Sequence, residues 1–564
     1  EIQKLVAFEG TFEVLFQIIK KEGSGDGRDD QAIVVLDCLA LLAILLKGNV
    51  LNQNYFRETD CMQYIAPLIT VTGSDLWFLT EKKMQCLAAS LNLIECLVQS
   101  TNSSTVSNQQ VLRKLGIPQK VLQLGLSRVN SVLIRSRALR TLAGLLHAQP
   151  ENHYLLATTS MTVGTDQSTQ PKMPLTPSKA LLQSCTADQP ALSRLLRVTL
   201  SSTSYFERSS ALRAFGSYLF QNADGQLALV STLTPVPVDD SAQLDTLPIG
   251  RQLIAAMMHY QDDPLRAWFS SLLLSYMVRD NEEAQNFLLK IPFDLPTDEG
   301  NLVLLRERLR SLLSLLIQDK SVQPIAVVGY LRFACLWISH CPRAVEYFYE
   351  DPTTISFLVE AIIQPTGDLH IRGLCALFFA LSFLHTDDPK LKNTLHGLIS
   401  HRIGTDKFSE KLRELRKSMA FMAAEQGNEP EKQEIAVDET SFDQLDRSVL
   451  FYDYGFTLFF KEVYDETLRE IKYSGQQQSP LKQIHRSSQK TNQRQADEIK
   501  QLKKQLDIQA KELEIYKLQT RNFQQQVDTL KSLPSSPARG LALNEDAQSS
   551  PSSSPSGSAA GPPP

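Results

Sequence analysis

Apolar residues recur at intervals of three and four from the start of the chain to about residue 420, and short polar breaks separate the runs. This spacing places apolar side chains on one face of an α-helix, whereas the alternation with a period of two that indicates strands is scarce. Each apolar stripe has to be covered by a neighbouring helix, so the pattern predicts an all-α fold of packed helices. One wide stripe comprises Leu36, Leu39, Ala40, Ala43, Ile44 and Leu46.

The stripes recur together with a second pattern. A leucine-rich run leads into a polar break, often with Asn or Gln, then to an aromatic or aliphatic pair and a further amphipathic helix. These breaks lie at 52–56, 108–112, 151–155, 283–288 and 343–348. Their spacing of about 40 to 70 residues exceeds the roughly 40 to 47 of armadillo and HEAT repeats, and we attribute the excess to inserted surface loops at 158–177 and 234–248. Residues 1–425 are therefore predicted to form an armadillo/HEAT-like helical solenoid, which presents a long surface for binding proteins.

The composition changes after the solenoid. Residues 426–475 begin with an acidic stretch and continue into an aromatic run at 451–456, whose helix we expect to close the head. Residues 476–498 form a basic linker. This linker could attract phosphates, but it has no interleaved aromatic residues, so we interpret it as a solvated connection. Residues 532–564 are rich in Ser, Pro and Gly, which predicts a disordered tail.

Residues 499–531 follow a heptad pattern, with apolar residues spaced alternately by three and four. This spacing is typical of a coiled coil, and the polar Gln509 and Thr520 would fix its register. We therefore predict a short coiled coil that makes the protein a homodimer; the alternative is a single amphipathic helix docked on the repeats. The predicted oligomerisation residues, which occupy the heptad core, are Ile499, Leu502, Leu506, Leu513, Tyr516, Phe523, Val527 and Leu530.

Charge and cysteine usage narrow the class of protein. The net charge of −5 gives no global field that would favour nucleic acid, and the longest apolar runs are shorter than the roughly 18 to 20 residues that span a bilayer. The eight cysteines are scattered without a C-x-x-C pair, so we expect reduced, buried thiols in the cytosol. The first residues lack an initiator Met and have the composition of a helix interior, so we expect a truncated N-terminus.

No motif for catalysis, a cofactor or a metal occurs in the sequence. Metalloprotease, P-loop and kinase signatures are all missing. His396 and His401 are five residues apart, whereas ligands on one helical face are three or four apart. The acidic pairs at 262–263 and 282–283 fall at polar breaks, where residues that cap helices are expected. We therefore predict no catalytic residue, no cofactor and no metal, and thus a protein that is not an enzyme.

Three segments carry a resemblance to a known family. The opening residues 1–9, the polar break at 52–56 and the aromatic run at 451–457 together resemble the globular head of the general vesicular transport factor family, which comprises golgin-type tethers acting between the endoplasmic reticulum and the Golgi. The resemblance extends over residues 1 to about 475 and the start of the coil. It rests on the order and extent of these segments, because none of them carries chemistry.

The resemblance implies a parallel homodimer with two armadillo-repeat heads. Such a tether is cytoplasmic and is recruited peripherally to Golgi membranes and ER-to-Golgi vesicles by a GTP-loaded Rab-family GTPase. It engages SNARE proteins and other golgins before fusion. The family's rod is much longer and ends in an acidic tail, whereas here the predicted coil is short and the tail is Ser/Pro-rich.

A second hypothesis is an armadillo-type peptide or cargo receptor. Such receptors place Trp and Asn at fixed intervals along a groove, but this chain has only Trp77, Trp268 and Trp337, far apart in the sequence. The sequence does not assign the surface that binds a partner.

Overall fold

The computed structural model describes nine stretches of the chain. The chain divides into two compact units, Glu1–Gly475 and Gln476–Pro564, and every described residue belongs to the first. The predicted basic linker, coiled coil and tail all lie outside the described residues. The described stretches are 10–23, 29–71, 80–99, 103–127, 131–162, 188–236, 247–294, 303–426 and 451–474.

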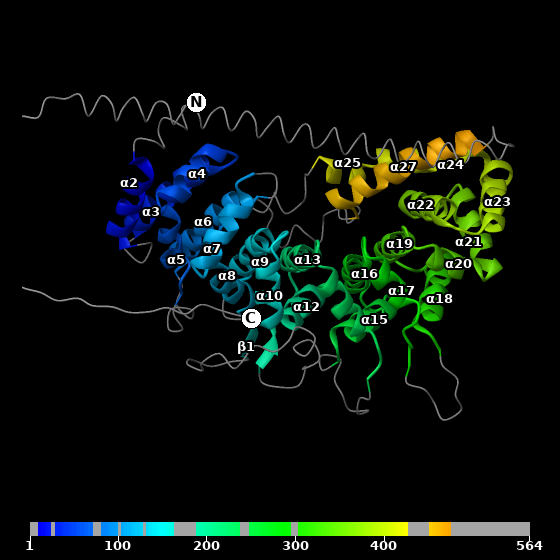
Figure 1. The fold of residues 1–564 in the computed structure, drawn as a ribbon, viewed down its shortest axis with the longest axis horizontal. Coiled ribbons are helices and arrows are strands. Elements are labelled where there is room, and N and C mark those ends of the chain that lie inside the picture. Colours follow the sequence, from blue (N-terminus) through cyan, green and yellow to red (C-terminus); the bar gives the residue numbers. More distant parts are fainter. Residues whose placement is uncertain are drawn as a thin grey trace, which may run out of the picture. The chain divides into compact units, whose positions relative to one another are not determined.

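The described part is a stack of three-helix repeats, in each of which a short first helix leads to a second helix and then to a third (Figure 1). This confirms the prediction of an all-α armadillo-like solenoid. The first helices are α4 (Val50–Glu58), α7 (Thr105–Lys114), α10 (Pro150–Thr158), α14 (Ala223–Ser231), α17 (Glu282–Leu288), α20 (Pro342–Tyr349) and α23 (Pro389–Gly397). The second helices are α5 (Ile65–Leu68), α8 (Ile117–Leu126), α12 (Ala191–Ser201), α15 (Ile249–Met258), α18 (Leu305–Gln318) and α21 (Pro352–Ile363).

The third helices pack side by side and form a continuous row through the stack. They are α3 (Asp29–Leu46), α6 (Glu81–Leu97), α9 (Val132–Leu146), α13 (Tyr205–Leu219), α16 (Pro264–Val278), α19 (Pro324–Ile338), α22 (Leu369–His385) and α24 (Thr405–Lys417). In this row α9 packs extensively along α13, and α16 along α19, but α13 and α16 make a smaller contact. The row is therefore thinnest between α13 and α16.

Three further helices and two strands accompany the repeats in the described part of the chain. Helix α2 (Phe12–Lys21) packs on α3, and α25 (Met419–Glu425) follows α24. The strands β1 (Ser160–Thr162), in the first predicted insertion, and β2 (Asp188–Pro190), beyond its predicted end, pair antiparallel. Helix α27 (Tyr454–Ser474) packs against α22, α24 and α25 and so lies over the row of third helices (Figure 1).

The buried face of α3 differs from the predicted stripe. Leu39, Ala43 and Leu46 are buried, but the side chain of Ile44 is 60% exposed and Ala40 is also exposed. Helix α3 is apolar on nearly every side, so the spacing of its apolar residues could not select one face. On α6, apolar residues at the same spacing do lie on one buried face, which comprises Leu87, Leu91, Ile94 and Leu97.

Three of the polar breaks seen in the sequence contribute to an amide ladder, which we define as the side chains of Gln53, Asn108, Gln109, Gln226 and Gln285 together with Asn281. The last carbonyl groups of a helix have no partner within it, and these amides supply one. Gln285 Nε2 donates to the carbonyl oxygens of Leu336 (3.1 Å) and Ser339 (2.9 Å) at the end of α19. Gln226 Nε2 does the same for Tyr276 (2.9 Å) and Arg279 (2.8 Å) at the end of α16.

The ladder also joins neighbouring repeats. Asn108 Nδ2 donates to Gln53 Oε1 at 3.0 Å and to the carbonyl of Leu97 at 2.9 Å. Asn281 Nδ2 donates to Gln226 Oε1 at 2.9 Å. Because all these amides are buried, each bond replaces one that water would otherwise make, and losing it would leave an unsatisfied polar group.

Candidate functional site

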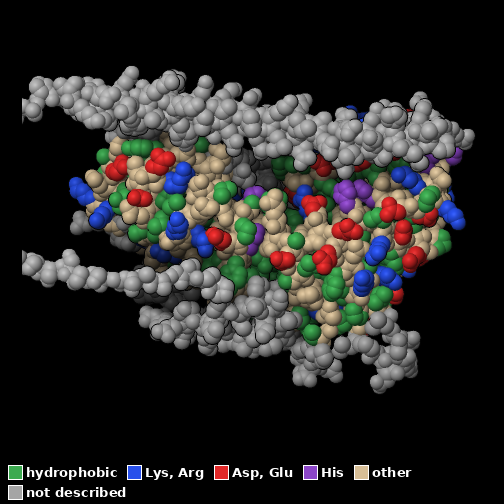
Figure 2. Space-filling view, in the orientation of Figure 1, with side chains coloured by type: hydrophobic (Ala, Val, Ile, Leu, Met, Phe, Trp, Pro, Cys, Tyr) green, Lys and Arg blue, Asp and Glu red, His purple; other side chains and the backbone are tan. Residues whose placement is uncertain are grey.

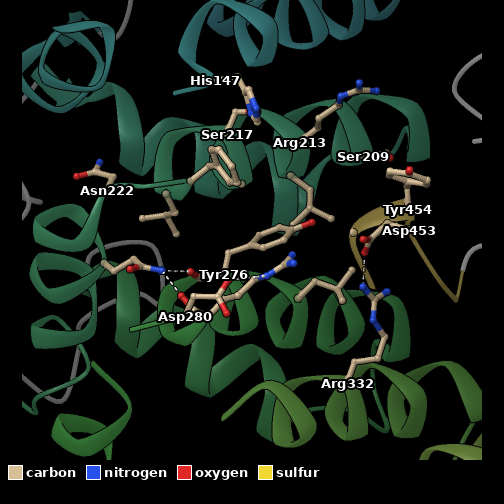
Figure 3. Close-up of a pocket in the computed structure, with 18 of the residues that line it drawn as sticks. His147, Ser209, Arg213, Ser217, Asn222, Tyr276, Asp280, Arg332, Asp453 and Tyr454 are labelled. Atoms are coloured by element: carbon tan, nitrogen blue, oxygen red, sulfur yellow. Dashed lines mark hydrogen bonds and ion pairs between the residues drawn. The ribbon is translucent and has the colours of Figure 1, made fainter. Parts of the chain in front are cut away.

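A cavity of about 670 Å³ lies between α13 and α16, where the row of third helices is thinnest. Figure 3 shows that its lining comes from these two helices, from the turns that follow them, from α19 and from the segment that begins α27. The labelled lining residues are His147, Ser209, Arg213, Ser217, Asn222, Tyr276, Asp280, Arg332, Asp453 and Tyr454.

The turns beside the cavity are built alike. Each third helix ends at a residue with positive φ, Gln221 (55°) after α13 and Asp280 (54°) after α16. The next residue is an Asn whose side chain caps the following helix: Asn222 accepts from the backbone N–H of Gly225 at 3.0 Å, and Asn281 does so for Ala284. Asn is among the residues most favoured for capping the start of a helix. The cavity rim is thus fixed by local sequence.

Charged side chains of both signs line the cavity. Arg213, Arg279 and Arg332 line it, against the carboxylates of Asp280 and Asp453. Arg279 Nε lies 3.3 Å from a carboxylate oxygen of Asp280, whose side chain is 81% exposed, so that pair contributes little to stability. On the visible face of the rest of the head, acidic and basic side chains are interspersed (Figure 2).

The aromatic part of the lining includes a stacked pair. The rings of His147 and Phe220 are 4.4 Å apart and nearly parallel, at 15°. Burial, followed by the nearby charge of Arg213, lowers the pKa of His147 below its usual range. His147 is therefore a neutral aromatic partner at pH 7, and the arginines supply the positive charge.

The segment before α27 is anchored to α19 by a buried arginine. Arg332 forms an ion pair with Asp453 and donates from Nη1 to the carbonyl oxygen of Phe451 at 2.7 Å. Its guanidinium group also lies 4.7 Å from the ring centroid of Phe456. Asp453 Oδ1 in turn accepts from the backbone N–H of Phe456 at 2.9 Å. We call these contacts of Arg332 and Asp453 the arginine anchor.

The aromatic residues beside the anchor are core residues. Phe451, Tyr452 and Phe456 are buried, and the Tyr452 hydroxyl lies 3.1 Å from His370 Nδ1 on α22. The rings of Tyr452 and Phe456 stack at 5.5 Å. The aromatic run at 451–456 therefore packs against the third helices of its own chain. Among its residues only Tyr454 is exposed, at 49%.

The anchor should respond to acid. Burial disfavours the charge of Asp453, but Arg332 and the hydrogen bonds outweigh burial and hold the pKa of Asp453 below its ordinary value. A depressed folded-state pKa means that the stabilisation is complete above about pH 5 and is lost as the pH falls towards 2. We expect the stability difference between the wild type and Asp453→Asn to be largest at neutral pH and to shrink steadily as the pH falls below about 4 in urea titrations. A difference independent of pH would contradict this.

Among the described residues there is no group of three or more His, Cys, Asp and Glu side chains that could hold a metal ion. The seven cysteines in the described part are free and buried, as expected, and burial raises the pKa of Cys61 and Cys96 to about 11 and of Cys375 to about 12. These thiols stay protonated near neutral pH. Cys185 lies outside the described residues.

The acidic pairs singled out in the sequence lie at the starts of helices. Asp263 caps α16 by accepting from the backbone N–H of Arg266 at 2.8 Å, and Glu282 and Glu283 stand in the first turn of α17. The predicted coil residues, from Ile499 to Leu530, all lie outside the described residues. Sequence reasoning missed the cavity itself, because its lining comes from residues up to about 300 positions apart.

A stack of helical repeats of this kind is an α-solenoid, an architecture whose extended surfaces suit protein partners. Residues 156–471 match the model of the family described as Uso1/p115-like vesicle tethering protein, head region. Since the match covers more than half of the chain, the chain belongs to this family.

Relatives and solved structures agree with this assignment. The chain is 29% identical to the human general vesicular transport factor p115 over 436 residues, which cover 76% of this chain and 42% of that protein. It is 24% identical to the Schizosaccharomyces pombe intracellular protein transport protein uso1 over 438 residues, 74% of this chain and 37% of that protein. The chain thus spans less than half the length of these relatives. A crystal structure of Uso1-1 has the same fold, with a TM-score of 0.61 at 20% identity over 84% of this chain and 69% of that one.

No single helix among the described residues has the length and apolar composition to cross a membrane. Helices α3 and α4 reach the required length and composition only as a pair, and they are bent by 118° at their junction.

Proposed function

We propose that this chain is a non-enzymatic vesicle-tethering scaffold in ER-to-Golgi and intra-Golgi transport. The observation that carries the proposal is the match of residues 156–471 to the head of a vesicle tethering family. The structure adds a solenoid suited to protein partners, with a cavity lined by charged and aromatic residues between α13 and α16. The chain acts in the cytoplasm, bound peripherally to Golgi membranes and transport vesicles through other proteins.

The partners proposed for the head are a GTP-loaded Rab-family GTPase, SNARE proteins and other golgins. The test is light scattering on the purified full chain with a panel of Rab GTPases, each loaded with a GTP analogue or with GDP. Binding of one member in its GTP form and not in its GDP form is the expected result. If no member binds, the Rab assignment fails, and the alternative of an armadillo-type peptide or cargo receptor takes its place.

The heptad residues are proposed to hold two chains together. Replacing both Leu506 and Leu513 by Asp puts charges into two core layers, so we expect the dimer to dissociate while the circular dichroism of the head is unchanged. Lys504→Asp with Lys511→Asp is the matched control, since it changes charge by the same sign at positions facing away from the core. Sedimentation that still shows a dimer in the leucine variant would mean that the coil is not the dimer contact.

Two chains in one particle would present two heads. Two weak head contacts on one membrane then act at high effective concentration, and the overall avidity exceeds that of one head by about 10² to 10⁴. This explains why a tether of this design needs no single strong contact.

A further inference from the structure

We propose that the arginine-rich start of α18 binds the phosphate groups of a phosphoinositide headgroup, so that the head also contacts the membrane directly. This inference goes beyond the proposed function, in which other proteins bring the chain to the membrane. It is carried by four arginines that lie on two aromatic rings, by two of these arginines that have no carboxylate partner, and by exposed apolar side chains beside them.

Two arginines of α18 lie on one tyrosine ring. The guanidinium groups of Arg306 and Arg310 are each 4.7 Å from the ring centroid of Tyr347 on α20. Arg310 donates from Nη1 to the carbonyl oxygen of Tyr347 at 3.3 Å, and a carboxylate oxygen of Glu350 lies 4.0 Å from the same nitrogen. Glu307 is the other carboxylate near this ring. Arg306 forms no ion pair and donates no hydrogen bond to a described residue.

The other two arginines lie on the ring of Phe293. Its centroid is 5.5 Å from the guanidinium group of Arg251, on α15, and 5.2 Å from that of Arg308. Arg251 donates to the carbonyl oxygen of Phe293 at 2.8 Å, and Asp294 is the carboxylate near it. Arg308 is exposed and, within the part of the chain that the structure describes, has neither an ion pair nor a hydrogen bond. The start of α18 therefore holds two arginines without a carboxylate partner there.

Arginines at this end of a helix favour a bound anion. The first turn of a helix carries a partial positive charge, which Asp and Glu usually offset. Helix α18 instead has Arg306 and Arg308 in this region, and its N-cap residue supplies no side-chain hydrogen bond. Nε of Arg306 and the hydroxyl of Tyr347 are also buried without a hydrogen-bond partner, so acceptors are lacking here. A guanidinium group that lies flat on a ring keeps its in-plane N–H donors for the oxygens of a phosphate.

The surroundings favour a membrane over a peptide. Leu315 follows Arg308 by two turns on the same exposed face of α18 and is 56% exposed. Ile363, on the α21 helix that packs on α18, is 48% exposed. Helix α18 contributes no residue to the cavity described above and lies on the side of the solenoid away from α27 (Figure 1). A face with arginines and protruding apolar side chains suits the boundary between lipid headgroups and acyl chains.

The balance of charges selects a headgroup with clustered phosphate oxygens. Glu307, Glu350 and Asp294 lie among the four arginines, so the surface has little net charge with which to attract any anionic lipid. Binding then depends on close contact with Arg306 and Arg308. A phosphate monoester carries a charge of about −1.5 to −2 and three strong acceptor oxygens, and it therefore suits two guanidinium groups better than the single charge of phosphatidylserine does.

The test is co-sedimentation of the full chain with lipid vesicles. Three kinds are compared: phosphatidylcholine alone, phosphatidylcholine with about 5% of a phosphatidylinositol monophosphate, and phosphatidylcholine with about 15% phosphatidylserine, which matches the negative charge. We expect the phosphoinositide vesicles to be bound at least about tenfold more tightly than the other two. The soluble headgroup, inositol bisphosphate, should compete for the protein because it presents the same phosphate.

Substitutions separate the contacts with the headgroup from those with the acyl region. Arg306→Gln and Arg308→Gln should each weaken binding to the phosphoinositide vesicles at least about fivefold. Leu315→Asp should weaken vesicle binding but leave the affinity for the soluble headgroup unchanged, because it removes only an apolar contact. Arg413→Gln, at an exposed position on α24, is the matched control and should bind like the wild type. Circular dichroism checks that each variant is folded.

Equal binding of the phosphoinositide and phosphatidylserine vesicles, or binding that survives in both arginine variants, would overturn the assignment. Competition by hexaglutamate and not by inositol bisphosphate would show that the arginines take an acidic protein segment instead. Asp298 and Glu299 precede α18 outside the described residues. Binding that appears only when they are changed to Asn and Gln would mean that these carboxylates occupy the arginines. The Rab experiment contains no lipid, so the failure of either proposal leaves the other standing.

Discussion

Replacing Trp337 by Ala is expected to lower the stability of the repeats around α19 by about 3 to 5 kcal/mol, the usual cost of removing a buried tryptophan side chain. Trp337 is fully buried, and its ring is stacked on Phe333 at 5.7 Å and meets Phe348 edge-on at 5.4 Å. Its Nε1 also donates to the carbonyl of Gln285 at 3.2 Å. The change removes packing between α19, α17 and α20 at once.

Urea denaturation followed by circular dichroism and by hydrogen exchange would measure this effect. A solenoid can unfold in parts, so exchange of the amides in α17, α19 and α20 locates the loss. Tyr154→Ala on α10 is the control, because that ring is 53% exposed and its loss should cost less than about 0.5 kcal/mol. Equal losses in the two variants would show that the packing around α19 is not what stabilises these repeats.

Replacing Arg332 by Met is expected to free the segment 451–456 from α19. Arg332 is 3% exposed, and Met fills most of its volume while removing the ion pair with Asp453 and the bond to the Phe451 carbonyl. Breaking a buried pair costs about 3 to 5 kcal/mol, but the Asp453 side chain is 36% exposed, so solvent screening reduces the expected loss to about 1 to 3 kcal/mol.

Hydrogen exchange over 451–460 measures that loss directly, as amide exchange about 5 to 150 times faster than in the wild type. Arg343→Met, on the exposed side of α20, removes a positive charge without touching the anchor and should leave this exchange unchanged. Protection of 451–460 that is the same in both variants would mean that the aromatic residues alone hold the segment.

The spacing of apolar residues was sufficient to predict the helices and their repetition along the chain. Stripes such as Leu305, Leu309, Leu312, Leu313 and Leu316 identify a buried face directly, and those residues are buried in α18. The polar breaks could also be seen in the sequence. The hydrogen-bond partners of their amide side chains could not. Gln285 and Ser339 are 54 positions apart, and a pattern of three and four reports only on neighbours within one helix.

The arginine anchor, too, could not be predicted in full from the sequence, because its two charged residues are far apart along the chain. A single Asp inside an aromatic run signals a carboxylate that needs a partner, and that much can be seen at Asp453. Arg332 is 121 positions away, and the head contains many arginines that the sequence presents as equivalent. Burial distinguishes Arg332 from the exposed ones, and burial on α19 depends on α22 and α27 packing around it.

The amide ladder has a consequence for dividing this protein into fragments. The side chain of Gln226 caps the end of α16 and also accepts a hydrogen bond from Asn281 of the next repeat. A fragment that ends after α16 would therefore lack the Asn281 donor. A fragment that begins at α17 would expose the Asn281 amide to solvent. No boundary between these repeats therefore separates two self-sufficient pieces. Shortened versions of the head are expected to be most stable when the first helices are kept together with the helices that their Gln and Asn side chains contact.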